Sequence, residues 1–217
     1  PRSSVHGLIG SLLAAGLLRK TDERHFALGA HVMYWANGFL AQQDIVAEFH
    51  EAIARLPELD PYTLTLSTLS NDQVVYLACR NSQSPLGFTF RIGMQLPAVF
   101  TATGKMMLSA LSAAEVQALL PQFPPPYTER SVQSHTELAD ELAGCRRQGY
   151  ALDDGQLRRG MHCFGTAVFD HAGQARFGVA ASLIEAEADE KTRQHLVDGL
   201  KKLAAQLTRT LGGQLPA

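Results

Sequence analysis

Cysteine, long apolar runs and net charge are all scarce in this chain of 217 residues, and each scarcity excludes a class of protein. The three cysteines, at positions 79, 145 and 163, are widely and unequally spaced. They match neither a disulfide framework nor a zinc motif, so we expect reduced thiols and a cytoplasmic protein. No apolar run is long enough to span a bilayer, and no charged-then-apolar leader is visible. The net charge of −2 argues against a wholly basic coat for nucleic acid.

Complete catalytic motifs are also missing. His50-Glu51 begins a zinc-protease motif, but Ala54 occupies the position of the second histidine. Gly104-Lys105 ends like a phosphate loop, but Val99 stands where the first glycine belongs, and Lys105 is expected to be a solvated helix residue. His162 and Cys163 are neighbours on a predicted strand and therefore face opposite sides. We predict no catalytic residue, no bound metal and no cofactor.

The composition of the chain is that of a folded globular protein. Hydrophobic residues make up 46% of it and charged residues 18%. The length suits one large domain or a small and a medium one. Residues 1–40 carry a local charge of +2, whereas residues 41–217 carry −4. A small basic head on a mildly acidic body is compatible with a DNA-binding module attached to a sensor.

The first thirty residues predict a helix followed by a hairpin. Val5, Leu8, Ile9, Leu12 and Leu13 share one face of a helix over 2–15, and Gly16 is a natural C-terminal stop. Residues 17–20 and 25–29 are short strand candidates joined by a polar turn at 21–24. This order is that of a recognition helix and wing in a winged helix-turn-helix.

The rest of the chain predicts a mixed α+β body. Helical patterns cover 30–40 and 44–56, a turn rich in small residues opens a helix over 101–111, and capping-box patterns begin at Ser112 and Ser134. A closing amphipathic helix carries Leu196, Leu200, Leu203, Leu207 and Leu211. Strands are expected over 62–69, 74–80, 86–93, 149–154, 163–170 and 176–184. These elements predict an antiparallel sheet flanked by helices.

Several stretches resemble one family. "PRSSVHGLIGSLLAAGLL" followed by "FALG", then "RIGMQLPAVFTATGKMMLSAL" and "GYALDDGQLRRGMHCFGTAVFD", are similar to the IclR-type bacterial transcription regulators in order and spacing. The resemblance implies a partial winged helix-turn-helix at 1–40, a connecting helix at 41–59 and a GAF-like effector-binding domain at 60–217. It further implies a homo-oligomer, as a dimer or dimer of dimers, and a DNA-binding head whose first helices lie outside this chain.

The resemblance also implies which residues contact double-stranded operator DNA. Arg2, Ser3, Ser4 and His6 would reach base edges from the start of the recognition helix, and Arg24 at the wing tip would meet phosphate or the minor groove. Gly7 departs from the family, whose members usually carry a longer and often basic side chain there. The structural alternative is that Ser3 and Ser4 merely cap an ordinary helix.

An effector site for a small carboxylate is implied in the body. The main chain at Ala102 and Thr103 would bind the carboxylate at a helix N-terminus. The opposite wall would supply polar contacts from Asp153, Cys163 and Ser182 and an apolar lining from Leu86, Phe88, Leu96 and Met161. Two departures, Ala180 in place of a hydroxyl residue and Val99 in place of histidine or another residue, make the site less polar. We therefore expect an acid with an apolar or aromatic body, such as an aromatic-catabolism intermediate.

Other interpretations of the same residues remain open. Asp153 also suits a plain polar turn, Cys163 is by default a small buried hydrophobe, and Ser182 is equally suited to bonding the main chain inside the core. At the level of function, the alternatives are a GAF-like sensory module acting on a protein partner and a cysteine-based reductase centred on Cys163. Salt-dependent DNA binding distinguishes the regulator from both.

Overall fold

The computed structural model describes residues 2–22, 25–41, 44–82 and 89–215. The chain divides into two compact units, Pro1–Asp44 and Ile45–Ala217. Each unit is described below by itself.

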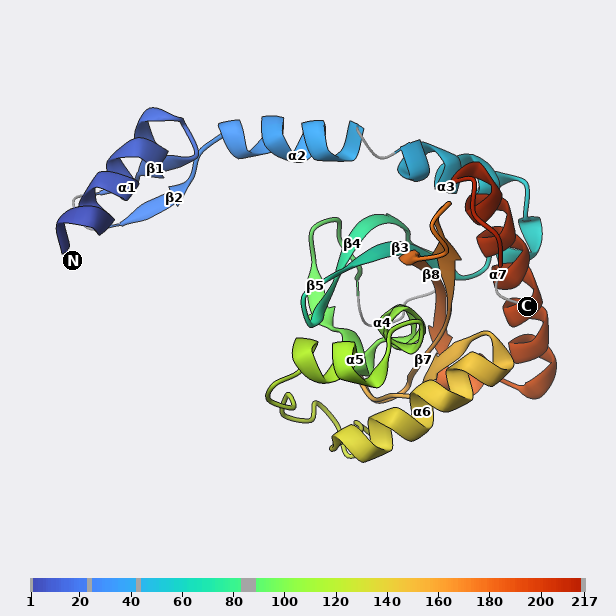
Figure 1. Cartoon of the computed structure of the whole chain (residues 1–217). Coiled ribbons are helices and arrows are strands. Elements are labelled where there is room, and N and C mark those ends of the chain that lie inside the picture. Colours follow the sequence, from blue (N-terminus) through green and yellow to red (C-terminus); the bar gives the residue numbers. More distant parts are fainter. Residues whose placement is uncertain (1, 23–24, 42–43, 83–88, 216–217) are drawn as a thin grey trace. The chain divides into compact units, whose positions relative to one another are not determined.

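The N-terminal unit consists of a helix, a hairpin and a second helix (Figure 1). Helix α1 (Arg2–Ala14) ends before Gly16, whose φ of +69° suits a residue without a side chain. Strands β1 (Leu18–Lys20) and β2 (Phe26–Leu28) pair antiparallel, and helix α2 (His31–Ala41) follows. The predicted helix and hairpin are confirmed.

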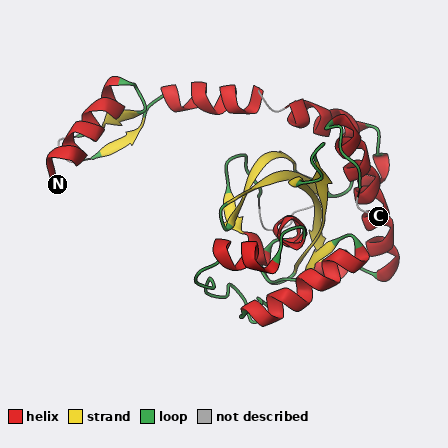
Figure 2. Cartoon of the chain, in the orientation of Figure 1, coloured by secondary structure: helices red, strands yellow, loops and turns green. Residues whose placement is uncertain are grey.

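A six-stranded antiparallel sheet forms the centre of the C-terminal unit, with strand order β5-β4-β3-β8-β7-β6. Its strands are β3 (Thr63–Ser70), β4 (Gln73–Arg80), β5 (Gln95–Pro97), β6 (Ala151–Asp153), β7 (Met161–Phe169) and β8 (Ala175–Ile184). Every neighbouring pair is antiparallel, and the sheet curls strongly (Figure 2). The α+β class with a helix-flanked antiparallel sheet is confirmed.

Helices cover both faces of this sheet. Helix α4 (Ala102–Ser109), preceded by the short 3-10 helix η2 (Ala98–Phe100), contacts β7 and β8 inside the curl, with α6 (His135–Gln148) against it (Figure 1). Helix α7 (Glu190–Thr210) packs on the other face, where it also contacts η1 (Pro57–Leu59). The remaining helices are α3 (Asp44–Ala54), α5 (Ala113–Leu119) and η3 (Glu185–Glu187).

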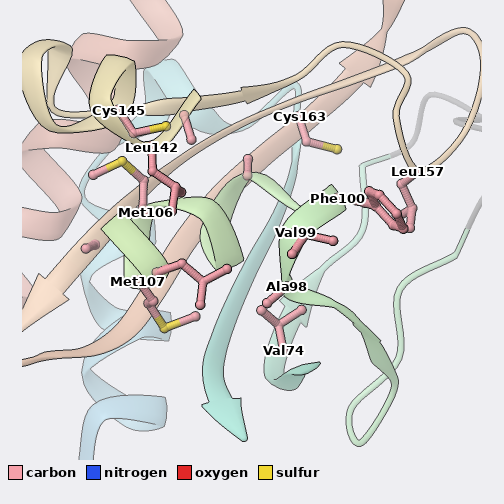
Figure 3. Packing of buried hydrophobic residues seen from close by; sticks show 14 of the residues in the cluster. Val74, Ala98, Val99, Phe100, Met106, Met107, Leu142, Cys145, Leu157 and Cys163 are labelled. Carbon is pink, nitrogen blue, oxygen red and sulfur yellow. The ribbon is translucent and has the colours of Figure 1, made fainter. Parts of the chain in front are cut away.

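Helix α4 is buried along its whole length and belongs to the core. Met106 on α4 packs in one cluster with Leu142 and Cys145 of α6 (Figure 3). Two glycines let the N-terminus of α4 approach the sheet. A Cβ atom at Gly178 would lie 2.6 Å from the Thr103 Cβ, and one at Gly165 would lie 2.9 Å from the Ala102 carbonyl carbon.

The strand predicted over 86–93 is wrong for the described residues 89–93. These residues lead into a turn in which Gly93 has a φ of +81° and Met94 N–H donates to the Arg91 carbonyl. The Gly93 N–H also donates to the Tyr76 carbonyl, so pairing with β4 begins at this turn and continues in β5. The β-branched and aromatic pattern predicted a strand in this part of the chain but misplaced it by several residues.

The two predicted capping boxes differ. At Ser112 both halves are present, because its hydroxyl accepts from the Glu115 N–H and the Glu115 carboxylate accepts from the Ser112 N–H. At Ser134 only the first half forms. There the Glu137 carboxylate accepts the N–H of Gln133, one residue earlier.

Candidate functional site

Three of the predicted polar residues form a row across the sheet. Asp153 on β6 is paired with Cys163 on β7, and Cys163 is paired with Ser182 on β8. Paired residues of antiparallel strands project to the same face, so the three side chains share the face toward α4. The Cys163 Sγ and Ser182 Oγ atoms are 3.1 Å apart. The β-sheet register therefore assembles a polar wall from distant parts of the chain.

The N-terminus of α4 faces this wall with unused main-chain donors. Thr101 is the N-cap, and its hydroxyl oxygen accepts from the Gly104 N–H at 3.2 Å. The N–H groups of Ala102 and Thr103 have no hydrogen-bond partner among the described residues. The Thr103 hydroxyl accepts a hydrogen bond from the Ser67 hydroxyl on β3 at 2.9 Å. Two free amides at a helix N-terminus are suited to bind an anion.

A small space separates the helix from the wall. Its volume is about 10 Å³, which is room for roughly one water molecule. The described residues that line it are Thr65, Tyr76, Phe90, Thr101, Ala102, Thr103, Asp153, Leu157, Cys163, Ala180 and Ser182. We call this space the α4 cavity.

Asp153 is the one acidic residue among the described residues that line the α4 cavity, and its exposed fraction is 0%. Its Oδ1 atom accepts hydrogen bonds from the N–H groups of Gly155, Gln156 and Leu157. Its Oδ2 atom is buried without a partner in the described part of the chain. Burial raises the pKa of this carboxyl to about 6, although nearby Lys105 and the three main-chain donors oppose the rise. Asp153 can therefore hold or release a proton near neutral pH.

Lys105 is buried, with 1% of its surface exposed, so the prediction of a solvated lysine is wrong. Its Nζ atom lies 2.6 Å from Glu141 Oε2 on α6 and donates to the Leu152 carbonyl at 3.1 Å. Glu141 also accepts a hydrogen bond from the Gln156 side chain. The lysine thus connects α4 with α6 and with the strand that carries Asp153.

The thiol and imidazole at 162–163 do not form a nucleophilic pair. Burial and the neighbouring Asp153 raise the pKa of the Cys163 thiol far above its usual value, so it stays protonated. His162 lies on the opposite face of β7, where Nε2 is 3.7 Å from Glu185 Oε1 and burial lowers the pKa of the ring. Within the described residues, no group of three His, Cys, Asp or Glu side chains is arranged to hold a metal ion.

Five of the nine predicted effector residues line the α4 cavity, namely Ala102, Thr103, Asp153, Cys163 and Ser182. Met161 lies in the hydrophobic core and Leu96 packs at its edge, and neither is among the described lining residues. Leu86 and Phe88 lie outside the described residues. Thr65, Tyr76, Phe90 and Leu157 also line the cavity but were not predicted. No local signal marks them, because each is an ordinary strand or loop residue.

In the N-terminal unit, Ser4 and His6 are exposed on α1. Only the main chain is described for Arg2 and Ser3, and Arg24 lies outside the described residues. Val5 and Leu8 on the predicted apolar face of α1 are also exposed, whereas Ile9, Leu12 and Leu13 are half-buried.

Helix α2 carries three large exposed side chains, Met33, Tyr34 and Trp35. Such a cluster on one short helix is typical of a surface that another molecule covers. No helix in the described part of the chain is both long and apolar enough to cross a membrane.

Relatives of known identity match this chain over most of its length. The acetate operon repressor of Salmonella typhimurium is 29% identical over 174 residues, which cover 78% of this chain and 64% of the repressor. The chain thus spans less than two thirds of that relative. The crystal structure of the repressor BlcR of Agobacterium tumefaciens is 45% identical in sequence to this chain and matches it with a TM-score of 0.76. The match covers 99% of this chain and 86% of the BlcR chain.

A third match supports the fold alone. The crystal structure of Thermotoga maritima IclR is 23% identical with a TM-score of 0.78, and the similarity covers 97% of this chain and 85% of that one.

The model of the C-terminal domain of bacterial transcriptional regulators of the IclR type matches residues 37–209. This chain therefore belongs to the IclR family of bacterial transcriptional regulators.

Proposed function

We propose that the protein is a cytoplasmic transcriptional regulator that binds operator DNA through its N-terminal unit. Binding of a small organic acid in the α4 cavity raises or lowers its affinity for that DNA. The observation that carries the proposal is the pair of free amides at Ala102 and Thr103, which face the buried Asp153 across that cavity. The named relatives, a repressor of an operon and a second repressor, support a role in transcription.

The DNA-binding part of the proposal rests on α1 and the hairpin. Ser4 and His6 are exposed near the start of α1, where a helix that enters the major groove reads base edges. His6→Ala in the full-length protein should weaken binding to its operator about tenfold. His171→Ala, which removes an exposed histidine from a turn of the body, is the matched control. Fluorescence anisotropy with DNA from upstream of the protein's own gene measures both.

Measuring the affinity for DNA at several salt concentrations makes this experiment more specific. Contacts to phosphate release counterions, so the logarithm of the affinity should fall steeply and linearly with the logarithm of the salt concentration. Two results would refute the placement of the recognition helix. One is an affinity for this DNA that does not change with salt concentration, and the other is an equal loss of affinity in the two histidine variants.

For the effector, the geometry favours an organic acid whose carboxylate accepts from the Ala102 and Thr103 amides. The cavity holds about one water molecule, so an acid with an apolar or aromatic body must push lining side chains outward. A thermal-shift panel of benzoate, 4-hydroxybenzoate, pyruvate and glyoxylate tests the size. Stabilisation by the two smallest acids alone would contradict the apolar-bodied effector.

An acid bound in the α4 cavity would also lie close to the carboxyl group of Asp153. Two ionised carboxylates in one small cavity repel each other, so an acid without a hydroxyl or amino donor should take up a proton at Asp153 when it binds. Its affinity should then fall about tenfold for each pH unit above the pKa of Asp153. Asp153→Asn should abolish this pH dependence while keeping the amides intact, as titration calorimetry between pH 5.5 and 8 measures.

We further propose that the regulator works as a homo-oligomer, either a dimer or a dimer of dimers, and that α2 supplies one interface. The exposed Met33, Tyr34 and Trp35 are suited to contact a second copy. The segment 44–56 would then transmit the ligand state to the spacing of two DNA-binding heads. The ligand changes operator affinity only if it binds the two states unequally, and a coupling of about 1–3 kcal/mol is typical.

A further inference from the structure

A second and larger cavity opens at the other end of α4. Its volume is about 570 Å³. The described residues that line it are Met106, Ser109, Ala110, Cys145, Arg146, Gly149, Thr166, Phe169, Gly173, Lys201, Ala204 and Leu215. They come from α4, α6, β7 and α7, from the residues that follow α4 and α6, from the turn between β7 and β8, and from the segment after α7. We call this space the α4–α7 groove.

The groove has an apolar interior of ligand size. Met106, Cys145, Phe169 and Ala204 are buried residues of the core that reach its surface, and Leu215 adds an exposed apolar wall. Figure 3 shows Met106 close to Cys145, with Cys163 farther away in the same cluster. The volume falls within the range of about 300–1,000 Å³ that is typical of small-molecule sites. No described residue lines both this groove and the α4 cavity.

Two cations border this apolar space. The Arg146 Nε–H donates to the Ser109 carbonyl at 2.6 Å, and the Lys201 ammonium donates to the Gln148 carbonyl at 2.9 Å. Neither side chain pairs with a carboxylate in the described part of the protein, and no Asp or Glu is among the described lining residues. The Lys201 ammonium also lies 5.6 Å from the centre of the Tyr150 ring. The groove therefore combines an apolar interior with two cations that bond main-chain carbonyls and have no carboxylate partner among the described residues.

We propose that the α4–α7 groove is a second ligand site, which binds an amphipathic monocarboxylate of the medium-chain fatty-acid class. The alkyl chain packs on Met106, Phe169 and Ala204, and the carboxylate meets the charges of Arg146 and Lys201. Burying an alkyl chain provides most of the affinity, and the cations select an anion over a neutral alcohol.

Octanoate and octan-1-ol are matched probes for this site. Titration calorimetry of the full-length protein should show octanoate binding about tenfold more tightly than octan-1-ol. Lys201→Gln should remove most of this preference. Lys202→Gln, which makes the same change of net charge one residue away, outside the groove lining, should leave it intact. Equal affinities for the two probes, or equal losses in the two variants, would overturn the charge argument.

The position of the probe is tested separately. Ala110 is an exposed lining residue with φ of −81°, so tryptophan is tolerated there and should block the groove, lowering octanoate affinity at least about tenfold. Octanoate should also shift the methyl resonance of ¹³C-labelled Met106 and leave that of the exposed Met33 unchanged. Unaltered octanoate binding by Ala110→Trp, or an unmoved Met106 methyl signal, would refute the site.

The remaining controls separate this site from the α4 cavity and from an interface. Asp153→Asn should bind octanoate like the wild type, and saturating propionate should not displace octanoate. Displacement by propionate would assign octanoate to the α4 cavity instead. Loss of the oligomer in Ala110→Trp, seen by sedimentation velocity, would identify the groove as a contact between copies of the chain and overturn the ligand proposal.

Discussion

The N-terminal unit and the C-terminal unit handle apolar side chains in opposite ways. Among the described residues of 1–44, only Gly29 is buried, while Val5, Leu8 and Trp35 are exposed. In 45–215, by contrast, an extensive core encloses even a lysine and an aspartate. The body has what it needs to fold by itself, whereas the head presents surfaces that suit partners. Matched substitutions in the two units, compared for stability and for assembly, test this difference.

The largest expected effect comes from truncating the core of the body. Phe49 on α3 is fully buried, so Phe49→Ala should lower the free energy of unfolding by about 4 kcal/mol through lost burial and a cavity. Trp35 on α2 is 58% exposed. Trp35→Ala should therefore leave the urea unfolding transition of the body unchanged but weaken self-association. A similar loss of stability in both variants would show that the head is not independent.

Asp153 should impose a pH dependence of about 3 kcal/mol on the stability of the body. The unfolded carboxyl titrates near 4, whereas the pKa of the folded one is raised to about 6. Between these values the native state keeps a proton that the unfolded state has lost. Stability should therefore fall as pH rises from about 4 to 6 and level off above, and Asp153→Asn should flatten that slope in urea titrations.

Removing the buried lysine should cost about 2–3 kcal/mol. Lys105→Met leaves Glu141 and Asp153 without their nearby cation, although Glu141 is partly exposed and so retains some hydration. Lys202→Met changes an exposed lysine of α7 and should cost little. Adding Glu141→Gln to Lys105→Met should recover part of the loss, and a failure to recover any would argue that packing outweighs charge here.

The smallest effect concerns the contact of α4 with the sheet. Gly178→Ala places a Cβ atom 2.6 Å from the Thr103 Cβ and should cost about 1–2 kcal/mol through overpacking. Because it displaces the Ala102 and Thr103 amides, it should also weaken binding of the acid. Gly144→Ala lies within α6, with the nearest atom 4.0 Å away, and should be neutral or slightly stabilising. Both are measured by thermal unfolding.

Elements with local signals were predictable. The apolar spacing of α1, the stop at Gly16 and the Leu repeat of α7 all depend on residues close in sequence, and each is present. The strand expected over 86–93 failed for its described part because a φ-positive turn at Gly93, which a residue pattern does not reveal, delays the pairing.

The site residues also divide into those that could be predicted from the sequence and those that could not. Ala102, Thr103, Asp153, Cys163 and Ser182 came from a family resemblance, and the register of the sheet and its contact with α4 now bring them around one cavity. Thr65 and Tyr76 were missed because their strands alternate like any half-buried strand. Lys105 was misjudged because its partners Glu141 and Leu152 lie 36 and 47 residues further along the chain.

Most of the helices and strands, the basic head and acidic body, and the family could be predicted from sequence alone, because propensity, periodicity and motif spacing act over short stretches of chain. The folded structure was needed to show that Lys105 is buried, that one oxygen of Asp153 has no partner among the described residues, and that α4 borders two cavities. Burial and pairing depend on which distant segments meet, and the free energy of a charge depends on that environment rather than on its neighbours in sequence.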